Sequence, residues 1–94
     1  MKTSTVTLWL RLENNSRFVR GKKGAREDIE RSHLQPHGMK KLSACEYELT
    51  FSYEDDADLD RQVYDLLREI DHEAELRSCF IEADIREKDT DRSW

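Results

Sequence analysis

The fold of this chain is decided by residues 5–12, TVTLWLRL, in which aliphatic residues alternate with other side chains. Successive side chains of a β-strand point to opposite faces of a sheet, so this period of two predicts a strand with one apolar face. The apolar face would carry four aliphatic residues, which are Val6, Leu8, Leu10 and Leu12. Trp9 would lie on the opposite face, because a register slip that buried it would expose those aliphatic residues.

Two later segments alternate in the same way and predict two more long strands. In residues 79–86 the apolar positions are Cys79, Ile81, Ala83 and Ile85, and in residues 45–53 they are Cys45, Tyr47, Leu49, Phe51 and Tyr53. Aromatic and β-branched residues are common in strands, which supports both assignments. Residues 39–42, Met-Lys-Lys-Leu, predict a short edge strand whose lysines would discourage pairing with another chain.

Two helices are predicted between these strands. The acidic residues 54–56 favour a helix start, and an apolar stripe of helical spacing then continues to about Leu76; its members are Leu59, Val63, Leu66, Leu67, Ile70 and Ala74. An earlier helix is predicted over residues 25–33, with Pro36 and Gly38 ending it. Two glycines weaken the preceding stretch by about 1 kcal/mol each. Residues 17–24 are therefore either the first turns of this helix or a basic loop.

The resulting order, β-α-(short β)-β-α-β, predicts an α+β fold. Each long strand has one apolar and one polar face, which is typical of a mixed or antiparallel sheet covered on one side only. Two amphipathic helices would cover that side and give a two-layer sandwich of ferredoxin-like βαββαβ topology with a short second strand. We expect residues 1–87 to form a single domain and residues 88–94 a polar, flexible C-terminal tail. The predicted core consists of Leu8, Leu10, Leu49, Phe51, Leu66, Leu67, Ile70 and Ile81.

Length and composition restrict the class of protein further. The chain has 94 residues, which suffice for one domain but not for two. No apolar run approaches the roughly 18 residues needed to cross a bilayer, and no apolar segment of a signal peptide follows Met1. Cys45 and Cys79 fall in predicted strands, where buried thiols are expected rather than a disulfide. These features predict a cytoplasmic protein with no membrane partner.

The net charge of −5 conceals an uneven distribution along the chain. Residues 17–41 contain eight basic and three acidic residues, whereas residues 42–94 contain six basic and seventeen acidic ones. The candidate anion-binding segment lies in the basic part and consists of Arg17, Arg20, Lys22, Lys23 and Arg26. It would contact phosphates or an acidic protein surface, with strong salt dependence and little sequence preference. The alternative is a solvated basic loop or helix face.

No motif of a known catalytic class occurs in the sequence. There is no glycine-rich phosphate loop and no nucleophile elbow. His33 and His37 are four residues apart, a spacing that suits a metal pair on one helix, but Pro36 intervenes and no third ligand is placed. We therefore expect no metal site, no cofactor and no catalytic residue, and the sequence leans against an enzyme.

The face of the sheet that the helices leave open carries two aromatic residues. Trp9 and Phe80 both fall on the polar register of their strands. With Arg11, Glu82 and Arg86 around them, they would form an aromatic centre with a polar rim, as modest protein interfaces do. This predicts binding of a protein partner, or of a second copy in a homodimer, through the open face.

RNA binding by the open face is disfavoured. Ferredoxin-like RNA-binding domains stack bases on aromatic residues of both central strands. Here the second central strand offers Glu46 and Glu48 in those places, and their carboxylates would repel a phosphate backbone.

Three functional hypotheses remain open at this point. The favoured one is a small non-catalytic interaction or regulatory protein that binds another protein or itself through the open sheet face. The second is a nucleic-acid-binding protein that uses the basic segment. The third is a small enzyme or ligand-binding subunit whose site forms between protomers.

Overall fold

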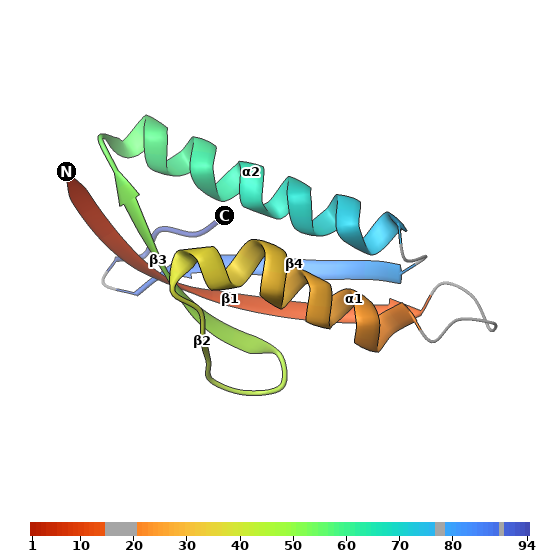
Figure 1. Cartoon of the computed structure of the whole chain (residues 1–94). Helices are drawn as coiled ribbons and strands as arrows, with labels where there is room; N and C mark the ends of the chain where they lie inside the picture. The colour runs from red at the N-terminus through yellow and green to blue at the C-terminus, as the bar shows by residue number, and fades with distance from the viewer. Residues whose placement is uncertain (15–20, 77–78, 89) are drawn as a thin grey trace.

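The computed structural model describes residues 1–14, 21–76, 79–88 and 90–94 (Figure 1). Its regular elements follow one another in the predicted order, beginning with a strand and ending with a strand. They are β1 (Lys2–Asn14), α1 (Gly21–Ile29), β2 (Lys40–Lys41), β3 (Glu46–Tyr53), α2 (Asp56–Leu76) and β4 (Cys79–Glu87).

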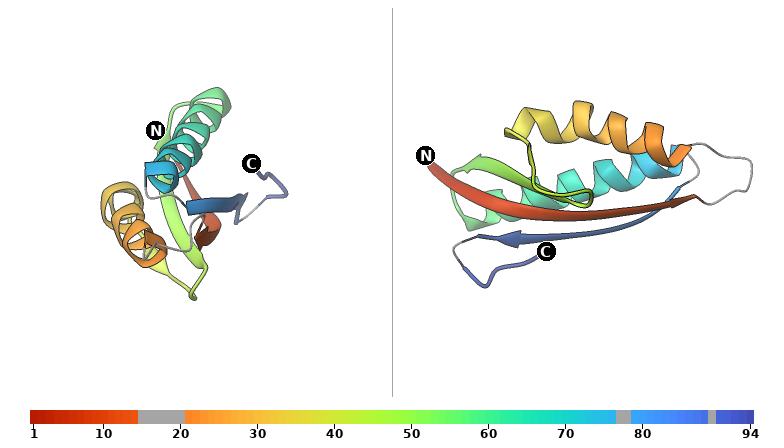
Figure 2. Two further views of the ribbon diagram at one scale, coloured as in Figure 1. Left: turned by 90° about the vertical axis from the view of Figure 1, so that its right-hand side faces the viewer. Right: turned by 90° about the horizontal axis from the view of Figure 1, so that it is seen from below.

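The four strands form one sheet in the order β2-β3-β1-β4, and each described pair of neighbours is antiparallel. β1 is central and pairs along most of its length with β3 on one side and β4 on the other. Both helices lie on the same face of this sheet, and the other face is left without a helix (Figure 2). The prediction of an α+β fold with two helices on one face is confirmed, and the sheet is antiparallel rather than mixed.

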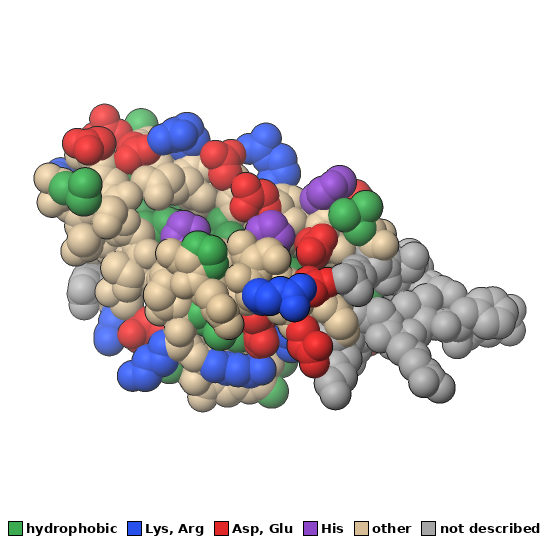
Figure 3. All heavy atoms as spheres, in the orientation of Figure 1, with side chains coloured by type: hydrophobic (Ala, Val, Ile, Leu, Met, Phe, Trp, Pro, Cys, Tyr) green, Lys and Arg blue, Asp and Glu red, His purple; other side chains and the backbone are tan. Residues whose placement is uncertain are grey.

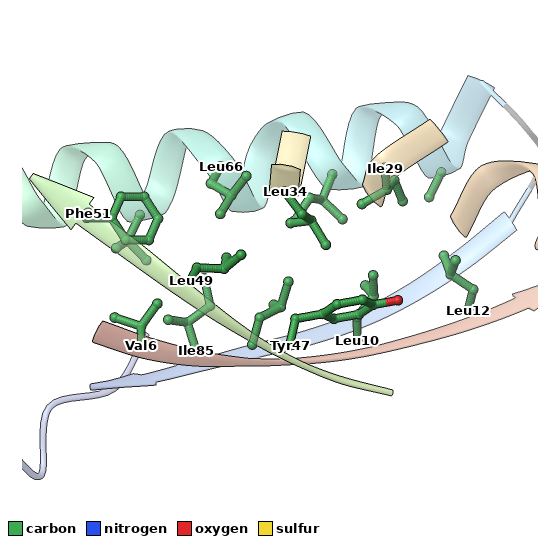
Figure 4. Close-up of a cluster of buried hydrophobic side chains, with 14 of the residues drawn as sticks. Val6, Leu10, Leu12, Ile29, Leu34, Tyr47, Leu49, Phe51, Leu66 and Ile85 are labelled. Carbon is green, nitrogen blue, oxygen red and sulfur yellow. The ribbon is translucent and has the colours of Figure 1, made fainter. Parts of the chain in front are cut away.

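The core lies between the sheet and the two helices (Figure 4). All four aliphatic residues of the β1 alternation are buried, with side chains at most 1% exposed. They meet buried side chains from both helices, β3 and β4, which include Ile29, Leu34, Tyr47, Leu49, Phe51, Leu66, Ile70 and Ile85. The alternation of β1 therefore predicts the inward face correctly.

Two residues predicted for the core, Leu67 and Ile81, are only half-buried and pack against its border. Leu67 lies beside the centre of the apolar stripe on α2, whose middle is occupied by the fully or nearly fully buried Leu66 and Ile70. Ile81 belongs to β4, which has β1 on one side only. The sequence pattern predicts that both side chains are fully buried, and in the structure neither is.

The first helix begins before residue 25, the predicted start, and includes Gly21 and Gly24. After Ile29 it continues as a wide turn over Glu30–Leu34 and a tight turn over Gln35–His37. Gly38 then ends it with φ 67° and ψ 43°, a left-handed conformation that glycine adopts without steric cost. The predicted end of the helix at Pro36 and Gly38 is confirmed. The short edge strand predicted over residues 39–42 is present but comprises only the two residues of β2.

The start of α2 is fixed by two carboxylates. The backbone N–H of Asp58 donates to the Asp55 side chain at 2.8 Å, and the N–H of Glu54 donates to the Asp58 side chain at 2.9 Å. This reciprocal cap satisfies backbone donors that a helix N-terminus otherwise leaves unpaired. The acidic run therefore acts as the predicted helix start.

The tail adds backbone hydrogen bonds to the outer edge of β4. Ile85 and Trp94 exchange bonds of 2.8 and 3.3 Å, and the N–H of Glu87 donates to the carbonyl of Arg92 at 2.9 Å. On the helix side, Asp60 of α2 accepts from the Trp94 indole at 2.9 Å and from Arg92 at 2.6 Å. The tail thus joins β4 to the start of α2, and its flexibility in solution stays a prediction.

The different burial of two adjacent leucines on α2 gives a test of the packing. We expect Leu66→Ala to lower the free energy of unfolding by about 2–5 kcal/mol, because it leaves a cavity in the core. Leu67→Ala should cost clearly less, because that side chain is already partly solvated. Urea denaturation of both variants measures the difference. Equal losses, or a larger loss for Leu67→Ala, would show that the helix is rotated relative to this packing.

Candidate functional site

The uncovered face of the sheet is arranged in rows by the strand pairing. In one row Trp9 of β1 stands between Glu46 of β3 and Asp84 of β4. In the next row Thr7 stands between Glu48 and Arg86. Because paired residues on neighbouring strands lie about 5 Å apart, Trp9 has a carboxylate-bearing neighbour on each side.

This part of the face is hollowed. An open hollow of about 280 Å³ is lined by Thr7, Trp9, Glu46, Asp84 and Arg86. Trp9 is 36% exposed although it belongs to the central strand of the sheet. Exposure of this large apolar side chain to water is unfavourable. A partner that covered Trp9 would remove that exposed apolar area and gain binding energy from it.

The charged groups of this face differ in how they are paired. Arg11 forms an ion pair with Glu13 at 2.8 Å, and Lys88 forms one with Glu48 at 3.6 Å. In the part of the chain that the structure describes, the side chains of Glu46, Asp84 and Arg86 have no such partner. Those three line the hollow. The charges nearest Trp9 are therefore the ones left available to a ligand.

All five residues predicted for partner binding are exposed on this face, and they are Trp9, Arg11, Phe80, Glu82 and Arg86. The register separates the two aromatic residues, however. Asp84 is paired with Trp9, whereas Phe80 is paired with Glu13, four residues further along β1. At about 3.4 Å per residue this is about 14 Å, so Trp9 and Phe80 do not share one aromatic patch.

The placement of Glu46 and Asp84 on either side of Trp9 was not predicted from the sequence. Both lie on the polar register of their strands, which was visible from the alternation. What the alternation does not contain is the offset between strands, and only that offset decides which residue stands beside Trp9.

Only part of the predicted anion-binding segment can be located. Arg17 and Arg20, and the side chains of Lys22 and Lys23, lie outside the described residues. Arg26 is turned toward the sheet, where it donates to the Tyr47 hydroxyl at 2.8 Å and to the Leu10 carbonyl at 2.9 Å. Its guanidinium therefore holds α1 against the sheet instead of facing an external anion.

Arg26 belongs to a half-buried polar cluster between α1 and the strands. The Tyr47 hydroxyl donates to Glu30 at 2.5 Å, and Lys41 of β2 donates to the same carboxylate at 3.0 Å. Partial burial alone would raise the pKa of Glu30, but the hydrogen bonds from Tyr47 and Lys41 and the nearby cations outweigh it and lower that pKa. Burial and the bond to Glu30 raise the pKa of Tyr47.

The Tyr47 cluster is suited to holding structural elements together. Its members do not line the hollow around Trp9, and among the described residues no buried side-chain polar atom lacks a hydrogen-bond partner. Each of its charged groups is occupied by another member, so none is left for a substrate.

The hydroxyl of Tyr47 is the junction of this cluster and gives a second test. We expect Tyr47→Phe to lower the free energy of unfolding by about 1–3 kcal/mol, because Arg26 and Glu30 each lose a bond while half-buried. Tyr53→Phe is the matched control, since the Tyr53 side chain has no hydrogen-bond partner among the described residues. Chemical denaturation of both variants decides, and equal effects would mean that the cluster does not hold α1 in place.

His33 and His37, whose spacing was weighed and rejected as a metal pair, lie on the helix face of the molecule, where histidine side chains are seen between α1 and α2 (Figure 3). Nδ1 of His33 is 3.5 Å from a carboxylate oxygen of Glu69. The ring of His37 packs on Phe51 with 4.3 Å between the ring centres. Within the described ranges, no three His, Cys, Asp or Glu side chains are placed to hold a metal ion.

The packing of His37 predicts a loss of stability in mild acid. Burial lowers the pKa of His37 below its ordinary 6.5, although the charge of Glu69 opposes the shift. As the pH falls below about 6.5, the unfolded chain binds a proton that the folded chain resists, so stability is lost until the lower folded pKa is passed. We expect His37→Gln to reduce the loss of thermal stability that the unsubstituted protein shows as the pH falls below about 6.5. An unchanged pH dependence of stability would contradict a lowered pKa for the half-buried His37.

Comparison with protein families, with curated proteins and with solved structures finds no match to this chain. Neither described helix is both long and apolar enough to cross a membrane. Both cysteines are described, and no disulfide joins Cys45 to Cys79.

Proposed function

We propose that this chain is a non-catalytic interaction protein of ferredoxin-like topology that binds another protein through the uncovered face of its sheet. The strand order β2-β3-β1-β4, antiparallel throughout the described pairs, supports the ferredoxin-like assignment. The observation that carries the functional proposal is Trp9, which stands exposed in a hollow at the centre of that face. Exposed aromatic residues in such places commonly dominate the energy of an interface.

A homodimer centred on Trp9 is the less favoured form of this proposal. A two-fold axis that passes through Trp9 in the plane of the face, parallel or perpendicular to β1, brings Glu46 opposite Asp84 or Glu46 of the second copy. Like charges at about 4 Å repel by about 1–4 kcal/mol, depending on how much water remains between them. The register around Trp9 therefore favours a different protein over a second copy.

Binding of nucleic acid remains the alternative function. The same two carboxylates speak against phosphate binding at the open face. The basic segment that would serve instead contributes Arg26 to the fold. A nucleic-acid partner would thus depend on Arg17, Arg20, Lys22 and Lys23, of which the structure describes no side chain.

The proposal is tested by photo-crosslinking in cells that naturally make the chain. A photoreactive phenylalanine replaces Arg11, which is exposed beside the Trp9 row, or Tyr64, which is 56% exposed on α2 and serves as the control. We expect position 11, and not position 64, to capture a protein whose purified form binds the chain. Trp9→Ala should then weaken binding by about 2 kcal/mol or more, and Tyr64→Ala should leave it unchanged.

Two results would overturn the proposal. One is capture from position 64 equal to that from position 11. The other is a captured protein whose affinity is the same for Trp9→Ala as for the unsubstituted chain. Adducts between two copies of the chain, together with dimers in sedimentation at micromolar concentration, would instead establish the homodimer.

A further inference from the structure

The hollow around Trp9 combines two features that suit a positively charged ligand. Trp9 lines it, and an exposed acidic residue lies beside Trp9 on each neighbouring strand, Glu46 on β3 and Asp84 on β4. Cations are attracted to the face of tryptophan more strongly than to that of other aromatic residues. The carboxylates add a direct charge partner on either side of the ring.

The charges next to this hollow are available rather than consumed inside the chain. Ion pairs already occupy Glu48 and Glu13, through Lys88 and Arg11 respectively. Among the described residues, no side chain pairs with Glu46 or Asp84. Arg86 lines the same hollow from the neighbouring row, opposite Thr7, and is not paired with Asp84 either.

The shape of the site favours a guanidinium over an ammonium group. A guanidinium is planar, stacks on an aromatic face and forms paired hydrogen bonds with a carboxylate. Glu46 and Asp84 belong to strands two steps apart, about 10 Å between backbones, and Trp9 lies on the strand between them. A guanidinium in contact with Trp9 therefore has an acidic residue on either side.

We infer that the hollow around Trp9 receives an arginine side chain from a basic segment of the partner protein, an inference that rests on the proposed function and specifies its partner. Arg86 keeps the incoming cation on the Glu46–Asp84 side of the hollow by repulsion. The partner surface is basic, in contrast to the net charge of −5 on this chain. Complementary charge of this kind raises the rate of encounter and selects among partners.

The test uses a short synthetic peptide in which arginine alternates with serine. Two matched peptides replace arginine by citrulline, which keeps the shape but not the charge, or by lysine. Binding is followed by the fluorescence of Trp9 in a Trp94→Phe background, where Trp9 is the one remaining tryptophan of the two in the chain. Isothermal titration calorimetry on the unsubstituted chain provides a measurement that does not depend on that background.

We expect the arginine peptide to bind and change the Trp9 emission, the lysine peptide to bind more weakly, and the citrulline peptide not to bind. The double variant Glu46→Gln/Asp84→Asn should weaken binding by about tenfold. Asp71→Asn/Glu75→Gln, which removes two exposed carboxylates from α2, is the charge-matched control and should change it little. Both pairs are at the surface, and thermal unfolding verifies that each variant is folded.

The inference is overturned if the arginine peptide fails to bind, if citrulline serves as well, or if the α2 control loses as much affinity as the Glu46/Asp84 variant. A single-stranded oligonucleotide that binds in place of the peptides would also overturn it. None of these results by itself contradicts the proposed function. That function is tested separately, by whether the crosslinked partner loses affinity for the Trp9→Ala variant. A partner that needs Trp9 but is indifferent to Glu46→Gln/Asp84→Asn would reject the arginine and keep the interface.

Discussion

The rest of the structure depends on the register of β1. This strand is paired on both sides, and its even-numbered residues from Val6 to Leu12 supply one wall of the core. Because successive side chains point to opposite faces, burying this wall forces the intervening residues onto the open face. Trp9 is exposed as a consequence of that constraint, since no shift of one residue could bury it without exposing the aliphatic residues on either side.

The two faces of the sheet are consequently used in different ways. The inner face is closed by two helices, and α1 is held by a polar cluster around Tyr47 in which each charged group is hydrogen-bonded. The outer face carries charges in rows, some paired and some not. The unmatched ones gather at Trp9, where Glu46 and Asp84 flank the ring. This contrast supports the proposal that the chain binds a partner through its outer face.

The sequence was sufficient for whatever depends on periodicity, and insufficient for whatever depends on offsets between elements. Alternation predicted the inward residues of β1, and the stripe on α2 predicted Leu66 and Ile70. The alternation within each strand could not show that Phe80 is paired with Glu13, far from Trp9, because the offset between strands is set by tertiary packing. Periodicity also does not reveal that Arg26, in a run of basic residues, turns inward to bond Tyr47 and Leu10.

The most direct measurement of the central claim is the quenching of Trp9 fluorescence by acrylamide in the free Trp94→Phe protein. If the aliphatic residues of β1 form the core wall, Trp9 lies on the open face. Because its side chain is 36% exposed, its emission should then be that of a partly solvated indole and be quenched by acrylamide in the folded state. A blue-shifted emission that acrylamide reaches only after unfolding would place Trp9 inside and contradict the register on which the structure and the proposed interface rest.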